Sequence, residues 1–189
     1  MVSGLQARAL LRRMAVKKFQ KNEGFTLIEL LIVVAIIGII AAIAVPGLLR
    51  ARQSGNEASA IGSVRALNSA EATYAASCGG GGYATTMAAL ALAPAGGVPF
   101  ISPDLTGGVK SGYNVAVAQG TSATVVLVAA NTCNGAATDA LATYYVHAEP
   151  VTVGSTGQRS FASDNRGTIY QLATGAVIPN TMAGAQVLQ

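Results

Sequence analysis

The hydrophobic positions of this 189-residue chain gather in one unbroken stretch near its N-terminus. Residues 25–45 make up 21 positions with a single charge, Glu29. At about 1.5 Å per residue, a helix of this length spans roughly 32 Å, which is enough to cross the hydrocarbon core of a bilayer. An ordinary secretory signal has a shorter apolar region, and the position of Glu29 does not fit one. The pattern therefore predicts a transmembrane helix.

A second, amphipathic helical stretch follows the apolar one. It begins at Pro46 and Gly47, where the missing backbone N–H of proline predicts a kink or local melting. Beyond them, apolar side chains recur at near multiples of three residues, and charged side chains take other positions. The apolar set is Leu48, Leu49, Ile61, Val64, Leu67 and Tyr74, and the charged set is Arg50, Arg52, Glu57, Arg65 and Glu71. We expect the helix to continue to about Ser77, where the glycine run at 79–82 ends it.

The remaining sequence alternates short apolar runs with turn residues, which is typical of β-strands. We expect strands at 114–118 and 124–130, which would form a hairpin, and at 141–148, 158–162 and 168–172. Asp, Asn and Gly between the last two strands favour a tight turn. The weak periodicity of residues 173–189 predicts an irregular tail. The fold class expected is α+β: a long N-terminal helix, transmembrane in its first half, with a small antiparallel sheet packed on its second half.

The distribution of charge indicates which side of the membrane each part occupies. Only 11% of residues are charged, below the fraction in ordinary soluble domains, and 51% are hydrophobic. Residues 1–24 contain six Lys or Arg and one Glu, a net charge of +5, so the chain's +4 leaves −1 for residues 25–189. This basic flank predicts a cytoplasmic N-terminus under the positive-inside rule. It gives no reason to expect direct nucleic-acid binding by residues 25–189.

Cys78 and Cys133 are the two cysteines, and both follow the membrane helix on the side that this rule exports. An oxidising compartment favours a disulfide between them. Two buried free thiols are the alternative, since free cysteines behave as small hydrophobic residues. Two isolated cysteines and one histidine lack the ligand spacing of a metal site. We therefore expect neither a metal nor a cofactor.

Glu29 is the residue of the apolar stretch that most needs a chemical explanation. A carboxylate in a membrane helix costs roughly 2.5 to 3.5 kcal/mol on insertion scales, and such residues are functional by default. No Lys or Arg lies between Phe25 and Leu49, so the nearest cation inside the apolar layer would be an α-amino group created by cutting before Phe25. The alternative is a glutamate stabilised by the helix dipole alone. Gly38 and Ala42 form a small-x-x-x-small pair that permits close helix approach.

The ten residues 21–30, KNEGFTLIEL, resemble the processing site of the type IV pilin and type II secretion pseudopilin family. The close match covers about residues 17–50. In that family a membrane peptidase cuts after the glycine and methylates the new N-terminal amine, usually on phenylalanine. The resemblance implies that Gly24 is the cleavage residue, Phe25 the methylated N-terminus and Glu29 the fifth mature residue. The amine of one subunit would then meet the glutamate of a neighbour during assembly.

The resemblance also implies partners and a location. The partners would be a prepilin peptidase and methylase, an inner-membrane pilus assembly platform and further copies of the chain in a helical filament. The chain would be a single-pass inner-membrane protein with its C-terminal domain outside the cytoplasm, and would then join an extracellular or periplasmic filament. The corresponding segments are a cleaved leader at 1–24, a transmembrane and polymerisation helix at 25–45, its amphipathic continuation at 46–77 and a globular domain at 78–189.

Two features differ from a simple pilin. A leader of 24 residues is long for the family, and a start at Met14 would leave a leader of 11 residues. Cys78 and Cys133 do not resemble the pair that closes a C-terminal loop in many pilins. A bridge between them would instead tie the helix end to the sheet.

An enzyme fits the sequence less well than a structural protein. A catalytic triad would depend on His147, the one histidine, and no nucleophile elbow or P-loop occurs. Beside two tyrosines, His147 is expected at a strand end. The acidic residues of the C-terminal part are dispersed at Asp104, Asp139, Glu149 and Asp164. Residues 164–167 lack the alternating ligands of a calcium loop, although some secretion pseudopilins bind calcium.

A membrane-tethered binding domain that never polymerises would need neither Glu29 nor a cleavable leader. Within the filament class, Glu29 argues against a tip-priming minor subunit, which in the family can lack this residue. A length after processing of 165 residues (189 minus 24) and a sequence without a calcium-like loop favour a pilus subunit used for adhesion or motility. A type II secretion pseudopilin is the alternative.

Overall fold

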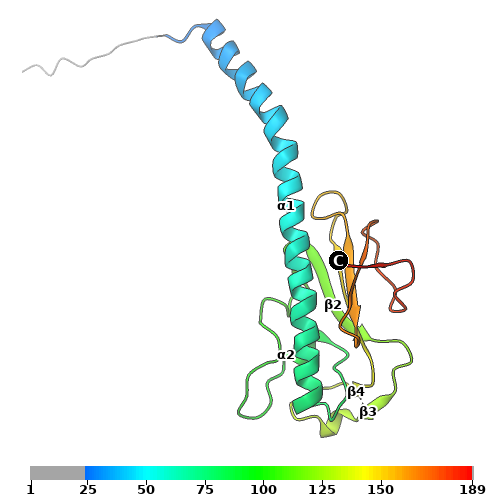
Figure 1. The fold of residues 1–189 in the computed structure, drawn as a ribbon. Helices are drawn as coiled ribbons and strands as arrows, with labels where there is room; N and C mark the ends of the chain where they lie inside the picture. The colour runs from blue at the N-terminus through cyan, green and yellow to red at the C-terminus, as the bar shows by residue number, and fades with distance from the viewer. Residues whose placement is uncertain (1–23, 189) are drawn as a thin grey trace, which may run out of the picture. The chain divides into compact units, whose positions relative to one another are not determined.

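The computed structural model describes residues 24–188 of the chain (Figure 1). The expected leader, except Gly24, and the alternative start at Met14 lie outside these residues. The chain divides into two compact units, one ending at Ile43 and the other beginning at Ala44. Helix α1 (Leu27–Ser77) is 51 residues long and contributes to both units.

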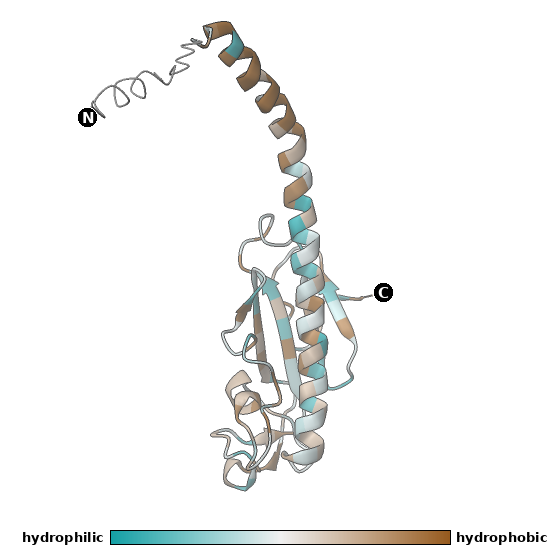
Figure 2. Ribbon diagram, turned by 90° about the vertical axis from the view of Figure 1, so that its left-hand side faces the viewer, coloured by the Kyte–Doolittle hydropathy of each residue, from teal (hydrophilic) through white to brown (hydrophobic). Residues whose placement is uncertain are grey.

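In the first unit, the described residues form the apolar start of α1. Every residue from Gly24 to Ile43 is exposed. Figure 2 shows this part of the helix as a nearly continuous apolar surface, which gives way to mixed and polar side chains along the second half of α1. Within residues 24–188, α1 is the one helix long and apolar enough to cross a membrane, as the sequence predicts.

The second half of α1 runs without interruption to the predicted end. The helix continues through Pro46, so the predicted local melting is wrong: proline removes one backbone hydrogen bond, and the turns on either side keep theirs. After Ser77 the chain turns at the glycine run. Gly79 lies so close to the carbonyl of Gly82 that a Cβ would come within 2.1 Å of its oxygen. A side chain at this turn would therefore force the backbone apart.

The second unit is an α+β arrangement of antiparallel strands against α1, which confirms the expected fold class (Figure 1). Its main sheet has the order β1-β2-β5-β6-β7-β8, and β3 and β4 form a separate pair. The elements after α1 are α2 (Met87–Ala91), β1 (Val109–Lys110), β2 (Tyr113–Gln119), β3 (Val125–Leu127), η1 (Ala129–Asn131), β4 (Ala140–Leu141), β5 (Tyr144–Pro150), β6 (Ser160–Asp164), β7 (Ile169–Leu172) and β8 (Gln186–Val187).

The predicted hairpin between residues 114–118 and 124–130 is wrong. Strand β2 pairs instead with β5, from Tyr113 opposite Pro150 to Gln119 opposite Tyr144, and β3 pairs with β4. The long-range pairing places the alternate buried residues of β2 and β5 on one face, where they can meet α1. A local hairpin would not bury this face. The predicted hairpin of β6 and β7 is confirmed.

The main core lies between this face and one stripe of α1. The buried residues of α1 recur at helical spacing and are Glu57, Ala60, Ser63, Val64, Leu67, Ala70, Glu71 and Tyr74. Strand residues of the same core include Tyr113, Val115, Val117, Tyr144, Val146, Ala148 and Phe161. The predicted apolar face is therefore only partly correct. Leu48 and Leu49 are exposed, whereas two glutamates expected on the polar face are buried.

The C-terminal segment covers the opposite face of the sheet. Ile178 and Met182 pack there against Tyr145 and Ala162, and the Tyr145 hydroxyl donates a hydrogen bond to the carbonyl of Ile178. Strand β8 then pairs with β7. The tail is irregular as predicted in most of its length, but it is a packed layer rather than a loose end. The sequence missed this because the buried tail residues follow no regular period.

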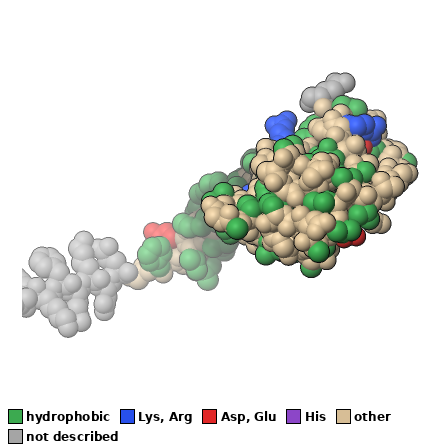
Figure 3. All heavy atoms as spheres, turned by 90° about the horizontal axis from the view of Figure 1, so that it is seen from below, with side chains coloured by type: hydrophobic (Ala, Val, Ile, Leu, Met, Phe, Trp, Pro, Cys, Tyr) green, Lys and Arg blue, Asp and Glu red, His purple; other side chains and the backbone are tan. Residues whose placement is uncertain are grey.

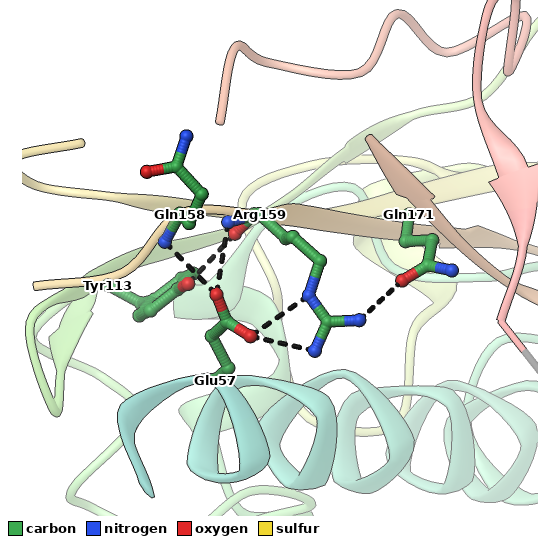
Figure 4. A network of polar contacts seen from close by, with 5 residues as sticks. All are labelled: Glu57, Tyr113, Gln158, Arg159 and Gln171. Atoms are coloured by element: carbon green, nitrogen blue, oxygen red, sulfur yellow. Dashed lines mark hydrogen bonds and ion pairs between the residues drawn. The ribbon is translucent and has the colours of Figure 1, made fainter. Parts of the chain in front are cut away.

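Glu57 joins α1 to the start of β6 through a polar network (Figure 4). Its Oε1 accepts the backbone N–H groups of Gln158 and Arg159 at 3.0 and 3.1 Å, and its Oε2 accepts Arg159 Nε and Nη2 at 2.9 and 2.7 Å. Arg159 also donates to Gln171, and its carbonyl accepts the Tyr113 hydroxyl. Burial works against ionisation, but Arg159 and the two N–H groups hold the pKa of Glu57 below its ordinary value. The charged pair therefore fixes the sheet on the helix.

Glu71 is a second buried glutamate of α1, and its carboxyl group contacts a backbone N–H rather than an arginine. Its side chain is fully buried, Oε2 accepts the backbone N–H of Ala84 at 2.8 Å, and Oε1 has no hydrogen-bond partner within residues 24–188. Burial raises the pKa of Glu71 to about 8, and the hydrogen bond from Ala84 offsets this only in part. Glu71 is therefore a neutral acid in the core at neutral pH.

The predicted disulfide between Cys78 and Cys133 is confirmed, with a Cα–Cα distance of 4.8 Å. Cys78 directly follows α1, and Cys133 lies between η1 and β4. The bridge thus ties the helix end to the connection between the strands of the small sheet. It closes a loop of 55 residues that includes α2, β1, β2 and β3.

We expect the stability of the protein to fall as pH rises from about 5 to 8. Because the folded pKa of Glu71 is about 8 and the ordinary value is 4.5, the folded state holds this proton more tightly. Its stabilising effect is complete below pH 4.5 and is lost as pH passes through 8. Thermal unfolding in detergent at several pH values should show this slope, and Glu71→Gln should remove most of it. Asp104→Asn, at an exposed carboxylate whose pKa Lys110 lowers, should leave the slope unchanged.

We expect loss of the disulfide to destabilise the second unit substantially. For a loop of 55 residues, the chain-entropy model gives roughly 4 kcal/mol, and measured bridges often give less. Paired replacement of Cys78 and Cys133 by Ala should lower the denaturant midpoint, and alkylation of unfolded wild type should label both thiols only after reduction. An unchanged midpoint, or equal labelling without reductant, would contradict this role.

Candidate processing and assembly site

The three residues predicted for processing and assembly lie together at the start of α1. Gly24 and Phe25 precede the first helical residue, and Glu29 stands in the first turn. A Cβ built on Gly24 would meet no atom within 4 Å, and Phe25 is 84% exposed. The Gly24–Phe25 bond is thus accessible in the described part of the chain. The basic residues expected on its N-terminal side lie outside that part.

Thr26 and Glu29 form a capping box at this helix end. The backbone N–H and the hydroxyl of Thr26 donate to Glu29 Oε2 at 2.9 and 2.8 Å, and the backbone N–H of Glu29 donates to Thr26 Oγ1 at 3.2 Å. These bonds satisfy two backbone donors that a helix N-terminus leaves open. Thr26 is therefore a site residue that the sequence analysis missed, although Thr-x-x-Glu before an apolar run is a recognisable signal.

The capping box uses only one of the two carboxylate oxygens. Among residues 24–188, no hydrogen bond is made to Glu29 Oε1, and no Lys or Arg lies between Phe25 and Leu49. A glutamate of this kind can hold the helix end through Oε2 and still accept a cation or donor at Oε1. The helix-end contact and an intermolecular ion pair are therefore compatible roles for the same carboxylate.

The helix that carries this site is exposed far beyond its first turn. Every residue from Gly24 to Arg52 is exposed, and the large apolar side chains from Leu27 to Leu49 are each at least 43% exposed. The small pair Gly38 and Ala42 lies within this surface, and a Cβ on Gly38 would meet no atom within 4 Å. The residues predicted for processing thus begin a helix whose apolar surface the described residues 24–188 leave exposed.

Cys78, Cys133 and His147 belong to the second unit and serve its structure. His147 lies in the middle of β5 rather than at the predicted strand end, because β5 runs on to Pro150. Its Nδ1 is 2.7 Å from Glu149 Oε2, and its ring stacks on Tyr145. Residues 24–188 contain no group of three or more His, Cys, Asp or Glu side chains placed to hold a metal ion.

The N-terminal segment matches a known family model. Residues 19–45 match the prokaryotic N-terminal methylation motif. The matched range contains the Gly24–Phe25 bond, the capping box and most of the apolar helix. The motif resemblance expected from the sequence is thereby confirmed.

Three curated relatives are each similar over part of the chain. The type IV major pilin protein PilA of Myxococcus xanthus is 45% identical over 62 residues, which are 32% of this chain and 28% of the relative. The type II secretion system core protein G of Vibrio cholerae is 40% identical over 58 residues, 31% of this chain and 40% of that protein. The type IV wide pilus major component PilA4 of Thermus thermophilus is 63% identical over 35 residues, 18% of this chain and 27% of the relative.

The matches thus span between about a quarter and two fifths of the lengths of these relatives. No solved structure is significantly similar to the chain. The methylation motif, the distant homology to type IV pilin PilA and to core protein G, and the pilin-like arrangement of a long helix and an antiparallel sheet agree with one another. The chain thus carries the prokaryotic N-terminal methylation motif, is distantly similar to type IV pilins and to a type II secretion core protein over part of its length, and has a pilin-like α+β arrangement.

Proposed function

We propose that this chain is the structural subunit of a type IV pilus-like filament, cut after Gly24 and assembled through its apolar N-terminal helix. The observation that carries the proposal is Glu29, a carboxylate in the first turn of an exposed apolar helix and the fifth residue after the cleavage point. A structural role agrees with two of the relatives, which are a type IV major pilin and a major component of a type IV wide pilus.

In this proposal, the exposed apolar surface of α1 lies first in the membrane and later inside the filament. Before assembly, the segment from Phe25 to about Val45 spans the inner membrane once, with the second unit outside the cytoplasm. In the filament, the same surface packs against the helices of other copies. Gly38 and Ala42 allow close approach between such helices.

Glu29 links processing to assembly through charge. Cutting after Gly24 removes the basic leader and leaves the α-amino group of Phe25, which the family peptidase methylates. A methylated amine remains a cation and a hydrogen-bond donor. We assign it to Glu29 Oε1 of a neighbouring subunit, while Oε2 stays with the capping box of its own chain. The pair cancels two charges that would otherwise be costly in an apolar interior.

The proposal divides the chain into four functional segments. Residues 1–24 are the cleaved leader, 25–45 the membrane and polymerisation helix, 46–77 its amphipathic continuation and 78–189 the globular domain. The partners that this scheme requires are a prepilin peptidase with methylase activity, an inner-membrane assembly platform and further copies of the chain. The filament lies outside the inner membrane, and adhesion or motility are the roles that we assign to it.

A type II secretion pseudopilus is the second candidate. Core protein G is 40% identical to this chain over 58 aligned residues, which makes it a relative of similar strength to the pilins. Two of the three relatives named above are major components of type IV pili, and this favours the pilus subunit. Surface filaments with unchanged protein secretion in a deletion strain would support the pilus subunit, whereas a secretion defect would support the pseudopilin.

Three substitutions separate the two roles of Glu29. Glu29→Gln keeps a side chain that can complete a capping box but removes the charge, Glu29→Ala removes both, and Thr26→Val removes the cap but keeps the charge. We expect both Glu29 variants to insert and to be processed, yet to lower filament yield roughly 10- to 100-fold, because a charge-assisted bond is worth about 1.5 to 3 kcal/mol. Thr26→Val should cost much less, since a cap contributes about 1 kcal/mol.

The measurement is the amount of sheared filament relative to processed subunit in the membrane. This ratio corrects for any difference in insertion or processing between variants. We expect both steps to proceed normally, because removal of a charge should not impair them. Wild-type yield from Glu29→Gln, with a large loss in Thr26→Val, would show that Glu29 acts as a cap alone. That outcome would remove the ion pair from the proposal.

A further inference from the structure

The second unit has two ends that can be located along α1. The loop at residues 151–157 lies beside Gln53 and Asn56, which donate hydrogen bonds to the carbonyls of Gly154 and Thr156. Strand β3 lies beside the glycine turn that follows α1, where a Cβ on Gly82 would be 3.0 Å from the Cβ of Val126. From Gln53 to Cys78 the helix rises roughly 38 Å, so these places are at opposite ends of the unit. We call them the loop end and the disulfide end.

The disulfide end exposes apolar side chains on a strand with a free edge. Val125 and Val126 of β3 are 54% and 44% exposed, and Val128, just after β3, is 49% exposed. Within residues 24–188, β3 pairs only with the two residues of β4. Figure 3 shows this end of the unit, where hydrophobic side chains are scattered among backbone and other uncharged side chains, and charged side chains are few. A cluster of exposed valines on an uncharged surface is the kind of patch that marks a protein contact.

The loop end exposes a matching set of valines. Val151 and Val153 are 51% and 48% exposed. Val177 is 54% exposed and follows Gly175, which lies against Val153. Residues 151–157 and 173–177 contain no charged side chain. Both ends of one unit therefore carry an apolar patch of the same chemistry.

Apart from the Glu57–Arg159 and His147–Glu149 pairs near the loop end, the charges that border the two patches are opposite in sign. Arg50 and Arg52 precede Gln53 at the loop end, are exposed and have no carboxylate within ion-pair distance among residues 24–188. Between Cys78 and Thr138, Asp104 and Lys110 are the charged residues, and they pair with each other at 2.6 Å. Asp139 stands next to β4 at the disulfide end, and one of its oxygens accepts the N–H of Ala129, beside Val128.

We propose that the loop end of one copy docks on the disulfide end of the next copy, with valines facing valines and Arg52 near Asp139. The proposal rests on the proposed filament function and names the faces of the second unit that meet. Two different patches on one chain make a heterologous contact, and such a contact repeats into an open helical filament when the rotation between copies does not close a ring. The opposite charges set the direction in which the copies meet.

Cysteine cross-linking tests the end-to-end contact. Val126→Cys and Val153→Cys are placed together and singly in the full chain, in cells that produce filaments, and sheared filaments are treated with a short flexible bismaleimide. The contact joins unlike ends, so we expect a ladder of cross-linked multimers from the double variant and none from either single variant. Cross-linked dimers from one single variant would indicate like ends in contact and would overturn the proposal.

Placing a charge in each patch gives a second test, which does not depend on how the two introduced cysteines are oriented. Val126→Asp and Val153→Asp should each lower filament yield at least about tenfold, the effect of 1.4 kcal/mol. The control is Val187→Asp on β8, because Val187 is 52% exposed and lies at the edge of the main sheet away from both ends. Equal yields from all three variants, or equal losses, would overturn the proposal.

Filament yield from the wild type separates the two proposals. Wild-type filaments whose double cysteine variant assembles without any multimer ladder would overturn the end-to-end contact and leave the proposed function standing. A wild-type chain that is processed but never forms filaments would overturn both.

Discussion

The apolar stretch of α1 is the constraint on which the rest of this molecule depends. Every residue from Gly24 to Arg52 is exposed, so the described residues 24–188 leave this surface largely uncovered. Apolar surface in water costs about 25 cal/mol per Å², which is why we propose that this helix lies in a membrane before assembly and against other copies afterwards. The second unit has to be stable without it. Its core, its disulfide and its two buried glutamates are the means by which a small, glycine-rich unit achieves this.

The three glutamates of α1 show three ways to accommodate a carboxylate outside bulk water. Glu57 stays charged because Arg159 and two backbone N–H groups surround it. Glu71 is buried with one backbone donor and holds its proton to about pH 8. Glu29 has a local partner in Thr26 and an unused oxygen. Only the last arrangement leaves a bonding site for another molecule, so it is the one that fits assembly.

The sequence predicted the features that depend on strong local signals. The apolar run and the end of α1 before the glycine turn belong to this class. The Cys78–Cys133 bridge is long-range, but it was predicted because only two cysteines occur and both follow the membrane helix. The processing motif was equally clear, because its residues are contiguous and match a family model. The paired strands β6 and β7 were predicted from a turn of Asp, Asn and Gly between them.

The errors arose where distant residues decide the outcome. The pairing of β2 with β5 depends on a shared face against α1, and no local pattern in residues 114–130 indicates it. The burial of Glu57 depends on Arg159, which is 102 residues away, and periodicity alone assigns a glutamate to the polar face. The packed tail likewise depends on Tyr145 and Ala162 of the sheet rather than on its own spacing. Long-range pairing of polar groups is thus the information that a single sequence did not provide.

The central claim is that cutting after Gly24 creates the cation that Glu29 requires in the filament. Mass spectrometry of subunits from sheared filaments tests it most directly, because it identifies the N-terminal residue and its modification in the assembled state. The account predicts a subunit that begins at Phe25 and carries one methyl group on its amine. Filament subunits that retain residues 1–24, or that begin at another residue, would contradict it.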